Sequence, residues 1–352
     1  MSDPSAVSNA APADVHELEE RLSRPRAETV AVFRELRGDV VILGAGGKMG
    51  PTLARMARRA ATEADGTDSA RRVIAVSRFS NHEARQALEA PGVEVASVDL
   101  LDHRAVRALP DAPNVVFMAG QKFGTDSAPS LTWAMNTLVP ALCAERYAGS
   151  RIVAFSTGNV YPLVPVEGPG SREIDSPAPV GEYAASCLGR ERMFEHASLR
   201  DGSPVAILRL NYAVDLRYGV LVDIAGKVLA GAPIDLAMGY VNVIWQGDAN
   251  RIALEALGKA SVPPFVLNVT GPERLRVRDV AERIGALLGR TPVFVGRESS
   301  DALLSETLLM QQQFAPPEVG ADTLLTWVVD WIRAGNPLLD RPTKFERRDG
   351  RF

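Results

Sequence analysis

The sequence predicts an α/β protein built on a doubly wound parallel sheet, with a smaller C-terminal lobe. The first observation is an apolar run, Val40–Leu43, which ends on a cluster of glycines and leads into a helical pattern from residue 50. The second is a regular alternation of short apolar runs with helical segments up to about residue 208. Segments that alternate in this way form parallel sheets with helices on both faces. The third is the loss of that rhythm after residue 209, which indicates a second lobe.

The elements of the sheet follow in chain order. We expect strands at 39–43, 73–77, 93–98, 114–118, 151–155 and 204–208. We expect helices between them at 50–62, 81–89, 102–108, 130–147 and 182–199. The connections between these parallel strands should be right-handed crossovers.

The rest of the chain divides into an extension, a lobe and a tail. Residues 1–37 form an N-terminal extension, with residues 1–13 predicted to be disordered and two short helices separated at Pro25. The extension is expected to be a surface brace or a dimer contact. The sheet domain spans 38–208, the lobe mainly 209–340, and a polar, basic tail 341–352 should run over the surface. In the lobe we expect helices at 219–230, 248–258, 277–288 and 322–333, an extended stretch at 240–245 and strands at 264–269 and 292–295, with 240–258 returning to the sheet. Such a lobe lies over the carboxyl ends of the strands, where ligands bind in open α/β sheets.

Composition excludes several classes of protein. The 352 residues are 46% hydrophobic and 23% charged, with a net charge of −4, which argues against a nucleic-acid binder, including an RNA-binding relative of this fold. No apolar run reaches the roughly 20 residues that cross a bilayer. The start of the chain lacks the features of a signal peptide. Two cysteines imply no disulfide framework, and four scattered histidines show no metal-ligand spacing. We therefore expect a cytoplasmic protein without a structural metal.

A glycine loop follows the first strand. Gly44, Gly47 and Gly50 are spaced three residues apart, and Lys48 and Met49 precede the last glycine. Glycines let the backbone approach a pyrophosphate, and the next helix points amide donors and a partial positive charge at it. Because a strand precedes the loop and a helix follows it, the loop predicts a nicotinamide dinucleotide on a Rossmann-like domain. It is not a nucleoside-triphosphate loop, since no Gly-Lys-Ser/Thr follows the glycines.

The end of the second strand indicates which dinucleotide is bound. NAD usually meets an Asp or Glu there, which accepts from the ribose hydroxyls. This chain has Ser77 and Arg78, and an arginine pairs with the 2′-phosphate of NADP. The pair favours NADP, with NAD as the alternative. Asp99 and Leu100, after the third strand, are expected near the adenine.

Further motifs follow the glycine loop in order. They are Asp99-Leu100, Asn114–Gly120, Met135-Asn136-Thr137, Ser156–Tyr161, Tyr183–Cys187 and Leu208–Tyr212. With the loop, this series resembles the extended short-chain dehydrogenase/reductases, also called the NAD-dependent epimerase/dehydratase family, from about residue 39 to about 334. The resemblance implies an NAD(P)-dependent oxidoreductase or epimerase that acts on a hydroxyl or ketone of a sugar-like molecule. It also implies a homodimer that pairs through the helices at 130–147 and 182–199.

The resemblance gives roles to the matched residues. Tyr183 would exchange a proton with a substrate hydroxyl, and Thr157 would hydrogen-bond the same oxygen. A phenol does this only if its pKa is lowered from about 10. The residues that would lie beside the cofactor are Ala119, Gly120 and Asn136, and those that would face the substrate are Asn159 and Asn211.

One position departs from the family pattern. The family has Tyr-x-x-x-Lys, and its lysine lowers the pKa of the tyrosine, whereas position 187 here is a cysteine. Another cation can substitute, and Lys122, after the fourth strand, is the candidate. Alternatively, Cys187 is itself an acid/base, since thiols titrate near 8.5, or it is a small packed residue. The remaining interpretation is a protein that binds cofactor and turns over slowly or not at all.

Two further departures concern the substrate. Family members that dehydrate sugars carry carboxylates after the threonine, and this chain has Gly158 and Asn159, so dehydration is not expected. Val241 stands where nucleotide-sugar enzymes place an arginine on the diphosphate, and Arg217 is a possible replacement. We expect a reductase or epimerase, and a cofactor-binding sensor or scaffold without turnover is the alternative.

Overall fold

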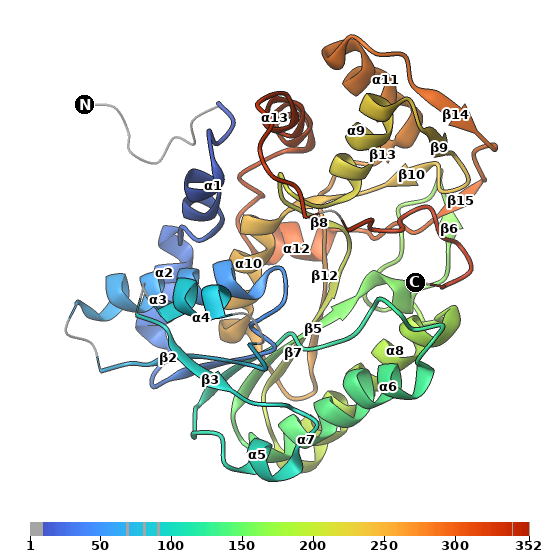
Figure 1. The fold of residues 1–352 in the computed structure, drawn as a ribbon. Helices are drawn as coiled ribbons and strands as arrows, with labels where there is room; N and C mark the ends of the chain where they lie inside the picture. The colour runs from blue at the N-terminus through green and yellow to red at the C-terminus, as the bar shows by residue number, and fades with distance from the viewer. Residues whose placement is uncertain (1–9, 68–69, 80–81, 90–91, 340, 352) are drawn as a thin grey trace.

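The computed structural model describes residues 10–67, 70–79, 82–89, 92–339 and 341–351. Figure 1 shows a sheet domain, drawn below, and a smaller lobe above it. The sheet has the order β12-β7-β5-β4-β1-β2-β3, and every neighbouring pair is parallel. Its strands are β1 (Val40–Leu43), β2 (Val73–Ser77), β3 (Glu94–Ser97), β4 (Asn114–Phe117), β5 (Arg151–Thr157), β7 (Val205–Leu210) and β12 (Phe265–Val269). The order runs outward from β1 in both directions, so the predicted doubly wound sheet is confirmed.

Helices cover both faces of the sheet. One face carries α2 (Ala27–Glu35), α3 (Gly50–Asp65), α4 (His82–Glu89) and α10 (Gln246–Glu255), and the other carries α5 (His103–Arg107), α7 (Val139–Arg146) and α8 (Gly181–Asp201). A short helix, α6 (Pro129–Trp133), and a π-helical turn, η1 (Ala134–Leu138), lead into α7. Val40 and Ile42 of β1 belong to the first core, while Val41 and Leu43 belong to the second. Burial on both faces explains why the strand reads as an unbroken apolar run.

The sheet extends beyond the predicted domain of residues 38–208. β12 pairs with β7 from Phe265 opposite Ala206 to Val269 opposite Leu210. The chain reaches this seventh strand only after passing through the lobe. α10 and the 3₁₀ turn Ala256–Lys259 also pack on the sheet, since Ala249, Ile252 and Leu257 belong to its core.

The lobe is built from helices and short strand pairs. Its helices are α9 (Val220–Ala230), α11 (Val277–Leu288) and α13 (Ala321–Arg333). The pairs are β9 (Pro233–Asp235) with β14 (Val293–Val295), β10 (Tyr240–Val241) with β13 (Leu275–Arg276), β8 (Ala213–Val214) with β11 (Ile244–Trp245), and β6 (Val164–Pro165) with β15 (Asp301–Ala302). Trp245 and Trp327 meet edge to face in its core, with ring centroids 5.7 Å apart. A further helix, α12 (Leu308–Gln313), contributes Met310 to the core of the sheet domain.

The N-terminal extension joins the two cores. It forms α1 (Val15–Leu22) and then α2, on either side of Pro25 as predicted. Leu18 and Leu22 are fully buried in the lobe core, and Phe33 is fully buried in the sheet-domain core. The extension thus contacts both cores through one buried face of each helix, while the opposite faces stay at the surface. Of the residues predicted to be disordered, 1–9 lie outside the described residues, and the carbonyl of Ala10 accepts a hydrogen bond from Arg21.

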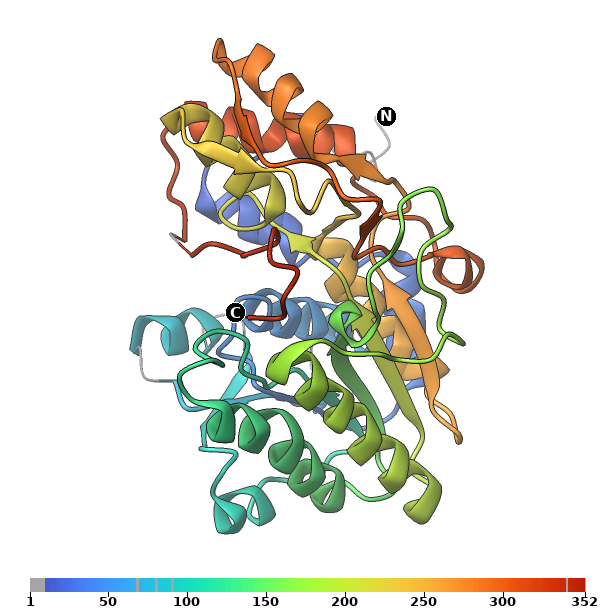
Figure 2. The ribbon, with the colours of Figure 1, turned by 90° about the vertical axis from the view of Figure 1, so that its right-hand side faces the viewer.

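The tail, residues 341–351, packs between the lobe and the sheet domain (Figure 2). Phe345 is buried in the lobe core, and the backbone amide and hydroxyl of Thr343 donate to Asp223. Farther along, Gly350 lies so close to the start of α8 that a Cβ on Gly181 would stand 2.6 Å from its carbonyl oxygen. The tail was expected to run over the surface, and Thr343 and Phe345 depart from that expectation because both are buried.

Candidate active site

The glycine loop, residues 44–50, has the geometry that a bound dinucleotide requires. Gly44 has a φ of +91°, and a Cβ there would lie 2.4 Å from the amide nitrogen of Ala119. A Cβ on Gly50 would lie 2.2 Å from the carbonyl oxygen of Ala45. At Gly47, by contrast, the nearest atom would be 3.6 Å away, and this residue is exposed. α3 starts just behind with no side-chain cap, and its N-terminal end carries a partial positive charge, so the residues present fit a pyrophosphate.

Lys48 connects the glycine loop to the lobe. Its Nζ donates to the carbonyl oxygen of Ala213 at 2.9 Å and lies 4.3 Å from the ring centroid of Tyr218. Burial lowers the pKa of Lys48 to about 8, and the charge of Asp215 acts in the opposite direction. The sequence placed Lys48 with the cofactor, and the structure adds that its side chain fixes the loop against the lobe.

The ends of β2 and β3 border the same loop. The Ser77 hydroxyl stands 2.6 Å from the place that a Cβ on Gly46 would occupy, so it faces the loop. Arg78 is exposed, and its carbonyl accepts a hydrogen bond from the side chain of Ser97. Of the two residues predicted near the adenine, Asp99 is exposed, whereas Leu100 packs into the core of the sheet domain.

Tyr183 and Thr157 meet at the carboxyl edge of the sheet. Tyr183 lies in the first turn of α8, and its hydroxyl forms side-chain hydrogen bonds with Thr157, at the end of β5, and with Cys187. Thr157 Oγ1 also accepts from the backbone amide and from Nδ2 of Asn159, at 3.2 and 3.0 Å. Burial raises the pKa of Tyr183 above its ordinary value, and the nearby Cys187 adds to this, while Arg190 opposes it. The two residues predicted to share one substrate oxygen are thus neighbours.

Cys187 occupies a small apolar cage. It is fully buried and packs with Val160 and Tyr161, against which Tyr183 and Leu188 also lie. Burial raises the pKa of the Cys187 thiol. A neutral thiol is therefore the stable form at physiological pH, and it supplies no positive charge to the phenol.

Lys122 lies in the loop after β4, between the tail and α8. Its Nζ donates to the carbonyl oxygen of Thr343 at 3.2 Å. Burial lowers the pKa of Lys122 to about 8, while Asp223 and Cys187 act in the opposite direction. The amine is thus close enough to Cys187 to act on it electrostatically, and it also contacts the tail.

Asn136 holds the turn that follows β4. It lies in the π-helical turn η1, and its Oδ1 accepts from the amide of Gln121 and from Arg190, both at 2.8 Å. Its Nδ2 donates to the Gln121 carbonyl oxygen at 2.9 Å and to Ser186 Oγ at 3.0 Å. Arg190 also donates to the carbonyl oxygen of Phe155 at 2.8 Å. None of the sequence motifs singles out Arg190, although the spacing 183, 187, 190 places three residues on one helix face.

A buried ionic network supports the edge of the sheet. Glu191 on α8 accepts from Ser156 at 2.5 Å and from Arg209 at 2.8 Å. Arg209 also donates to the Tyr161 hydroxyl at 2.7 Å, and that hydroxyl donates to Asn268 at 2.9 Å. The network joins α8, β5, β7 and β12, so it fixes the strand ends between which Thr157 and Tyr183 meet.

Asn211 does not fit its predicted role in substrate binding. Its side chain is 2% exposed, and its Nδ2 donates to Ser305 at 2.9 Å. A Cβ on Gly158 would stand 1.8 Å from its Oδ1. Asn211 therefore packs under the turn that follows β5, against Gly158. Asn159 is only partly buried and lies beside Thr157.

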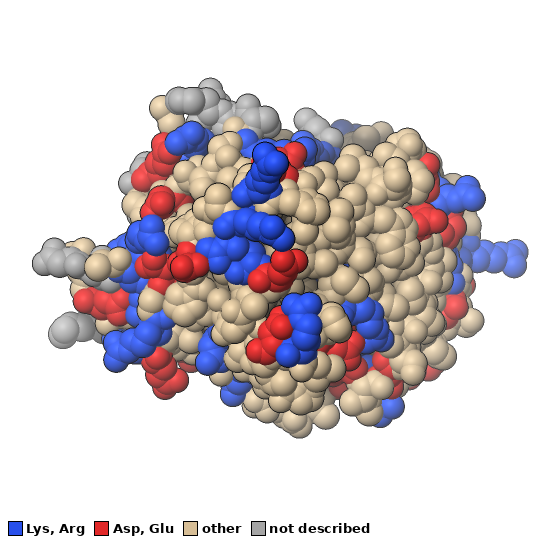
Figure 3. Space-filling view, turned by 90° about the horizontal axis from the view of Figure 1, so that it is seen from below, with Lys and Arg blue, Asp and Glu red and all other residues tan. Residues whose placement is uncertain are grey.

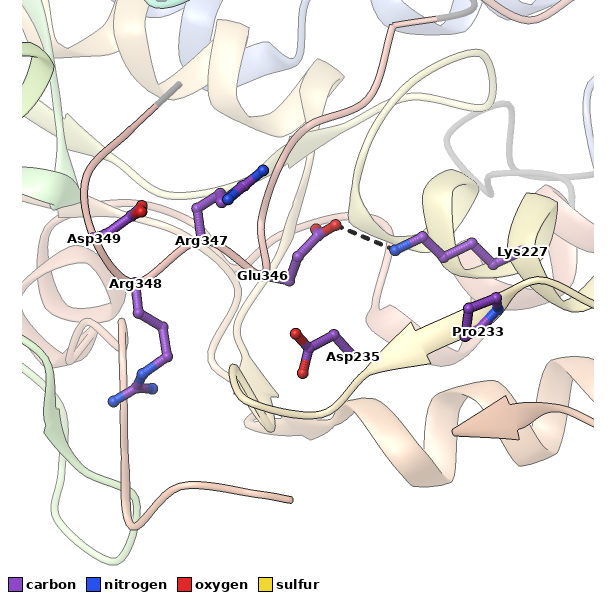
Figure 4. A pocket seen from close by; sticks show the side chains of 7 residues that line it. All are labelled: Lys227, Pro233, Asp235, Glu346, Arg347, Arg348 and Asp349. Atoms are coloured by element: carbon purple, nitrogen blue, oxygen red, sulfur yellow. Dashed lines mark hydrogen bonds and ion pairs between the residues drawn. The ribbon is translucent and has the colours of Figure 1, made fainter. Parts of the chain in front are cut away.

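A cavity of about 510 Å³ lies between the tail and the lobe. Its lining includes Lys227, Asp235 and Arg348, and Figure 4 shows Lys227 reaching Glu346 across it. Arg347 and Arg348 point in opposite directions there. Within the described residues, no group of three His, Cys, Asp or Glu side chains is placed to hold a metal ion. No helix in the same part of the chain is both long enough and apolar enough to span a membrane.

Comparisons with known proteins establish the fold. No protein-family model and no curated protein matches the sequence. Solved structures do match, at low identity. UDP-glucose 4-epimerase from Thermotoga maritima with UDP-glucose is 17% identical, with a TM-score of 0.69, over 84% of this chain and 99% of its own. UDP-glucuronic acid 4-epimerase from Bacillus cereus with NAD is 18% identical, with a TM-score of 0.68, over 84% of this chain and 98% of its own. The Bordetella bronchiseptica enzyme WbmG with NAD is also 18% identical, with a TM-score of 0.70, over 85% of this chain and 95% of its own. The Rossmann-like fold with its C-terminal lobe is therefore shared with these proteins.

Proposed function

We propose that this chain is an NAD(P)-dependent oxidoreductase or epimerase that acts on a hydroxyl or ketone of a sugar-like molecule. The observation that carries the proposal is the hydrogen bond between Tyr183 and Thr157 at the sheet edge that also carries the glycine loop. Structural neighbours that hold NAD or a UDP-sugar support the same assignment.

In the proposed reaction, Tyr183 exchanges a proton with the substrate hydroxyl. A dinucleotide held by the glycine loop would supply or accept the hydride. Thr157 hydrogen-bonds the substrate oxygen and holds it against the phenol, and Asn159 orients the Thr157 hydroxyl. Burial excludes water from the phenol and thereby disfavours its ionised form, so the proton transfer requires positive charge nearby.

Calorimetric titration with NAD and with NADP tests cofactor binding. The exposed Arg78 after β2 favours NADP, whereas two of the neighbours named above, the Bacillus cereus epimerase and WbmG, hold NAD. The Arg78→Asp variant should lose affinity for NADP and keep or gain affinity for NAD, because an acid repels the 2′-phosphate and accepts from ribose hydroxyls. Arg85→Asp, on α4, is a control that changes the same charge. Equal effects of the two variants would contradict the placement of Arg78.

A panel of nucleotide sugars and keto-sugars, followed by NAD(P)H absorbance and by epimer analysis, tests turnover. Tyr183→Phe should abolish the activity that the panel detects, because it removes the exchangeable proton. Tyr147→Phe is the matched control, since that hydroxyl donates to the carbonyl oxygen of Pro110, remote from the site. If Tyr183→Phe keeps the wild-type rate, the proposed reaction is wrong.

The second candidate is a cofactor-binding sensor or scaffold without turnover. The neutral, fully buried thiol of Cys187 beside the phenol favours it. This candidate predicts dinucleotide binding in calorimetry together with no hydride transfer to any member of the panel. Detection of a Tyr183-dependent rate eliminates it.

We also propose that the chain pairs with a second copy through the face of α6, η1 and α8. Leu131, Leu138 and Leu199 on these elements are 42%, 44% and 61% exposed. Figure 3 views the molecule from the side where α5 and α7 lie, and a broad area there carries no charged side chains. Light scattering of Leu138→Glu should show a monomer, whereas Leu229→Glu, on α9, should match the wild type. A monomeric wild type would refute the pairing.

A further inference from the structure

We propose that Arg190 is a positioning residue that supplies the fixed positive charge behind the Tyr183 phenol. The proposal rests on the proposed function, because only a phenol that takes up and releases a proton needs such a charge. Nothing in the sequence motifs assigns Arg190 a role.

The position of Arg190 on α8 places its charge on the same face of the helix as Tyr183. Tyr183, Cys187 and Arg190 are separated by four and three residues, so they follow one another along one side of the helix. The rise from Tyr183 to Arg190 is about 10 Å. α8 approaches η1 closely at this level, since a Cβ on Gly189 would stand 2.6 Å from the Thr137 hydroxyl.

The guanidinium also borders the predicted cofactor site. A Cβ on Gly120 would lie 2.4 Å from its terminal nitrogen, so only glycine leaves room for Arg190 at this turn. The preceding residue, Ala119, is the one that presses on Gly44 of the glycine loop. Arg190 is thus separated from the glycine loop by two small residues.

The hydrogen bonds of Arg190 fix its orientation through its two terminal nitrogens and do not involve its Nε. Asn136 and the carbonyl oxygen of Phe155 accept from its two terminal nitrogens. Both acceptors are neutral, and in the part of the chain that the structure describes no carboxylate pairs with Arg190. The Nε of Arg190 is buried and has no hydrogen-bond partner among the described residues. A buried cation held only by neutral groups acts on its surroundings through its field.

Among the charged and titratable groups around the Tyr183 phenol, Arg190 is the one whose positive charge changes least with pH. Cys187 and Arg190 act on Tyr183 from α8, while Lys122 from the β4 loop and Glu191 from α8 act on Cys187. Lys122 loses its proton near pH 8, whereas an arginine stays charged throughout. Glu191 is paired with Arg209, so its charge is compensated.

The test is the titration of Tyr183, followed by NMR of protein whose six tyrosines carry ¹³C at Cζ. Tyr183→Phe assigns the signal, and spectra are recorded with and without a saturating amount of NAD or NADP, whichever calorimetry shows to bind more tightly. In the wild type, the Tyr183 signal should titrate at a lower pH than in any variant that lacks the Arg190 charge. The Arg190 charge opposes the rise in the pKa of Tyr183, so Arg190→Gln should raise the midpoint of this titration.

Three further variants make the outcome decisive. Arg190→Met is a second neutral variant, which fills the same space if Arg190→Gln does not fold, and Arg190→Lys should restore most of the shift. Arg192→Gln removes the same charge from an exposed pair with Glu195 and should leave the midpoint unchanged. The proposal is overturned if the neutral variants match Arg192→Gln, including the case in which none of these proteins shows a Tyr183 titration. A failure of the proposed function looks different, since neither dinucleotide then binds or Tyr183→Phe keeps its activity.

Discussion

The glycine loop offers a pair of substitutions that separate folding from binding. Gly44→Ala and Gly47→Ala each add one methyl group, three residues apart. Gly44 lies underneath the loop, against the backbone of Ala119, whereas Gly47 lies on its exposed side. The first change should therefore reduce stability, and the second should reduce dinucleotide affinity.

The magnitudes follow from the local geometry. At Gly44, a φ of +91° costs an alanine roughly 1–2 kcal/mol, and a Cβ 2.4 Å from Ala119 N and 2.5 Å from its Cα adds about 1–3 kcal/mol of overlap. The expected loss in the free energy of unfolding is thus about 2–5 kcal/mol. At Gly47, φ lies outside the left-handed region and the nearest atom is 3.6 Å from the added carbon. A change of less than about 1 kcal/mol is expected there.

Dinucleotide affinity should respond in the opposite way, with the larger effect at Gly47. A methyl group on Gly47 stands where the pyrophosphate must approach the backbone, so the dissociation constant for the preferred dinucleotide should rise at least about tenfold, or ~1.4 kcal/mol. Urea unfolding followed by tryptophan fluorescence measures stability, and calorimetry measures binding. If Gly44→Ala unfolds with the wild type, the steric reasoning is wrong. If Gly47→Ala binds both dinucleotides as the wild type does, the loop is not their cradle.

Three more predictions concern charge and packing. Lys122→Met removes a buried amine whose pKa is lowered to about 8. The unfolded chain keeps that proton up to about pH 10.4, so between pH 8 and that value the free energy of unfolding of the wild type should rise by up to ~1.4 kcal/mol per pH unit relative to the variant. Urea unfolding at two pH values in this range measures the difference between the two proteins. A difference that does not change with pH contradicts the prediction. Glu191→Gln leaves the charge of Arg209 buried and unpaired, so it should lower the free energy of unfolding by about 3–5 kcal/mol. The exposed control Glu195→Gln should lower it by less than about 1 kcal/mol. Similar losses for the two variants would show that the buried network does not stabilise the fold. Leu18→Ala should cost about 2–5 kcal/mol by the same assay, and a loss below that range would mean that α1 is not part of the core.

Local patterns in the sequence were enough to predict the parallel sheet. Val40–Leu43 and Val73–Val76 are apolar on both faces because both faces are covered, and such runs are visible in the sequence. The glycine loop was equally visible, because its spacing and its flanking strand and helix are local. The proximity of Thr157 and Tyr183 could be predicted only from the resemblance to a family, since 26 residues separate them in the chain.

The features that the sequence did not reveal depend on distant contacts. β12 looks like any short apolar strand, and its place beside β7 depends on the path through the lobe. Phe345 is a single apolar residue in a basic segment, so periodicity could not show that it is buried. Asn211 follows a strand that ends beside the site, but the register of β7 turns its side chain under Gly158.

The arrangement of α1 has a consequence for biosynthesis. Leu18 and Leu22 leave the ribosome first, yet the lobe core that covers them includes α13, about 300 residues later. Arg21 likewise lies 5.2 Å from the ring centroid of Trp327. Pairing of such distant segments is slow, because a long loop must close before the contacts form. During translation the apolar face of α1 therefore remains exposed to chaperones and proteases until almost the whole chain has been made.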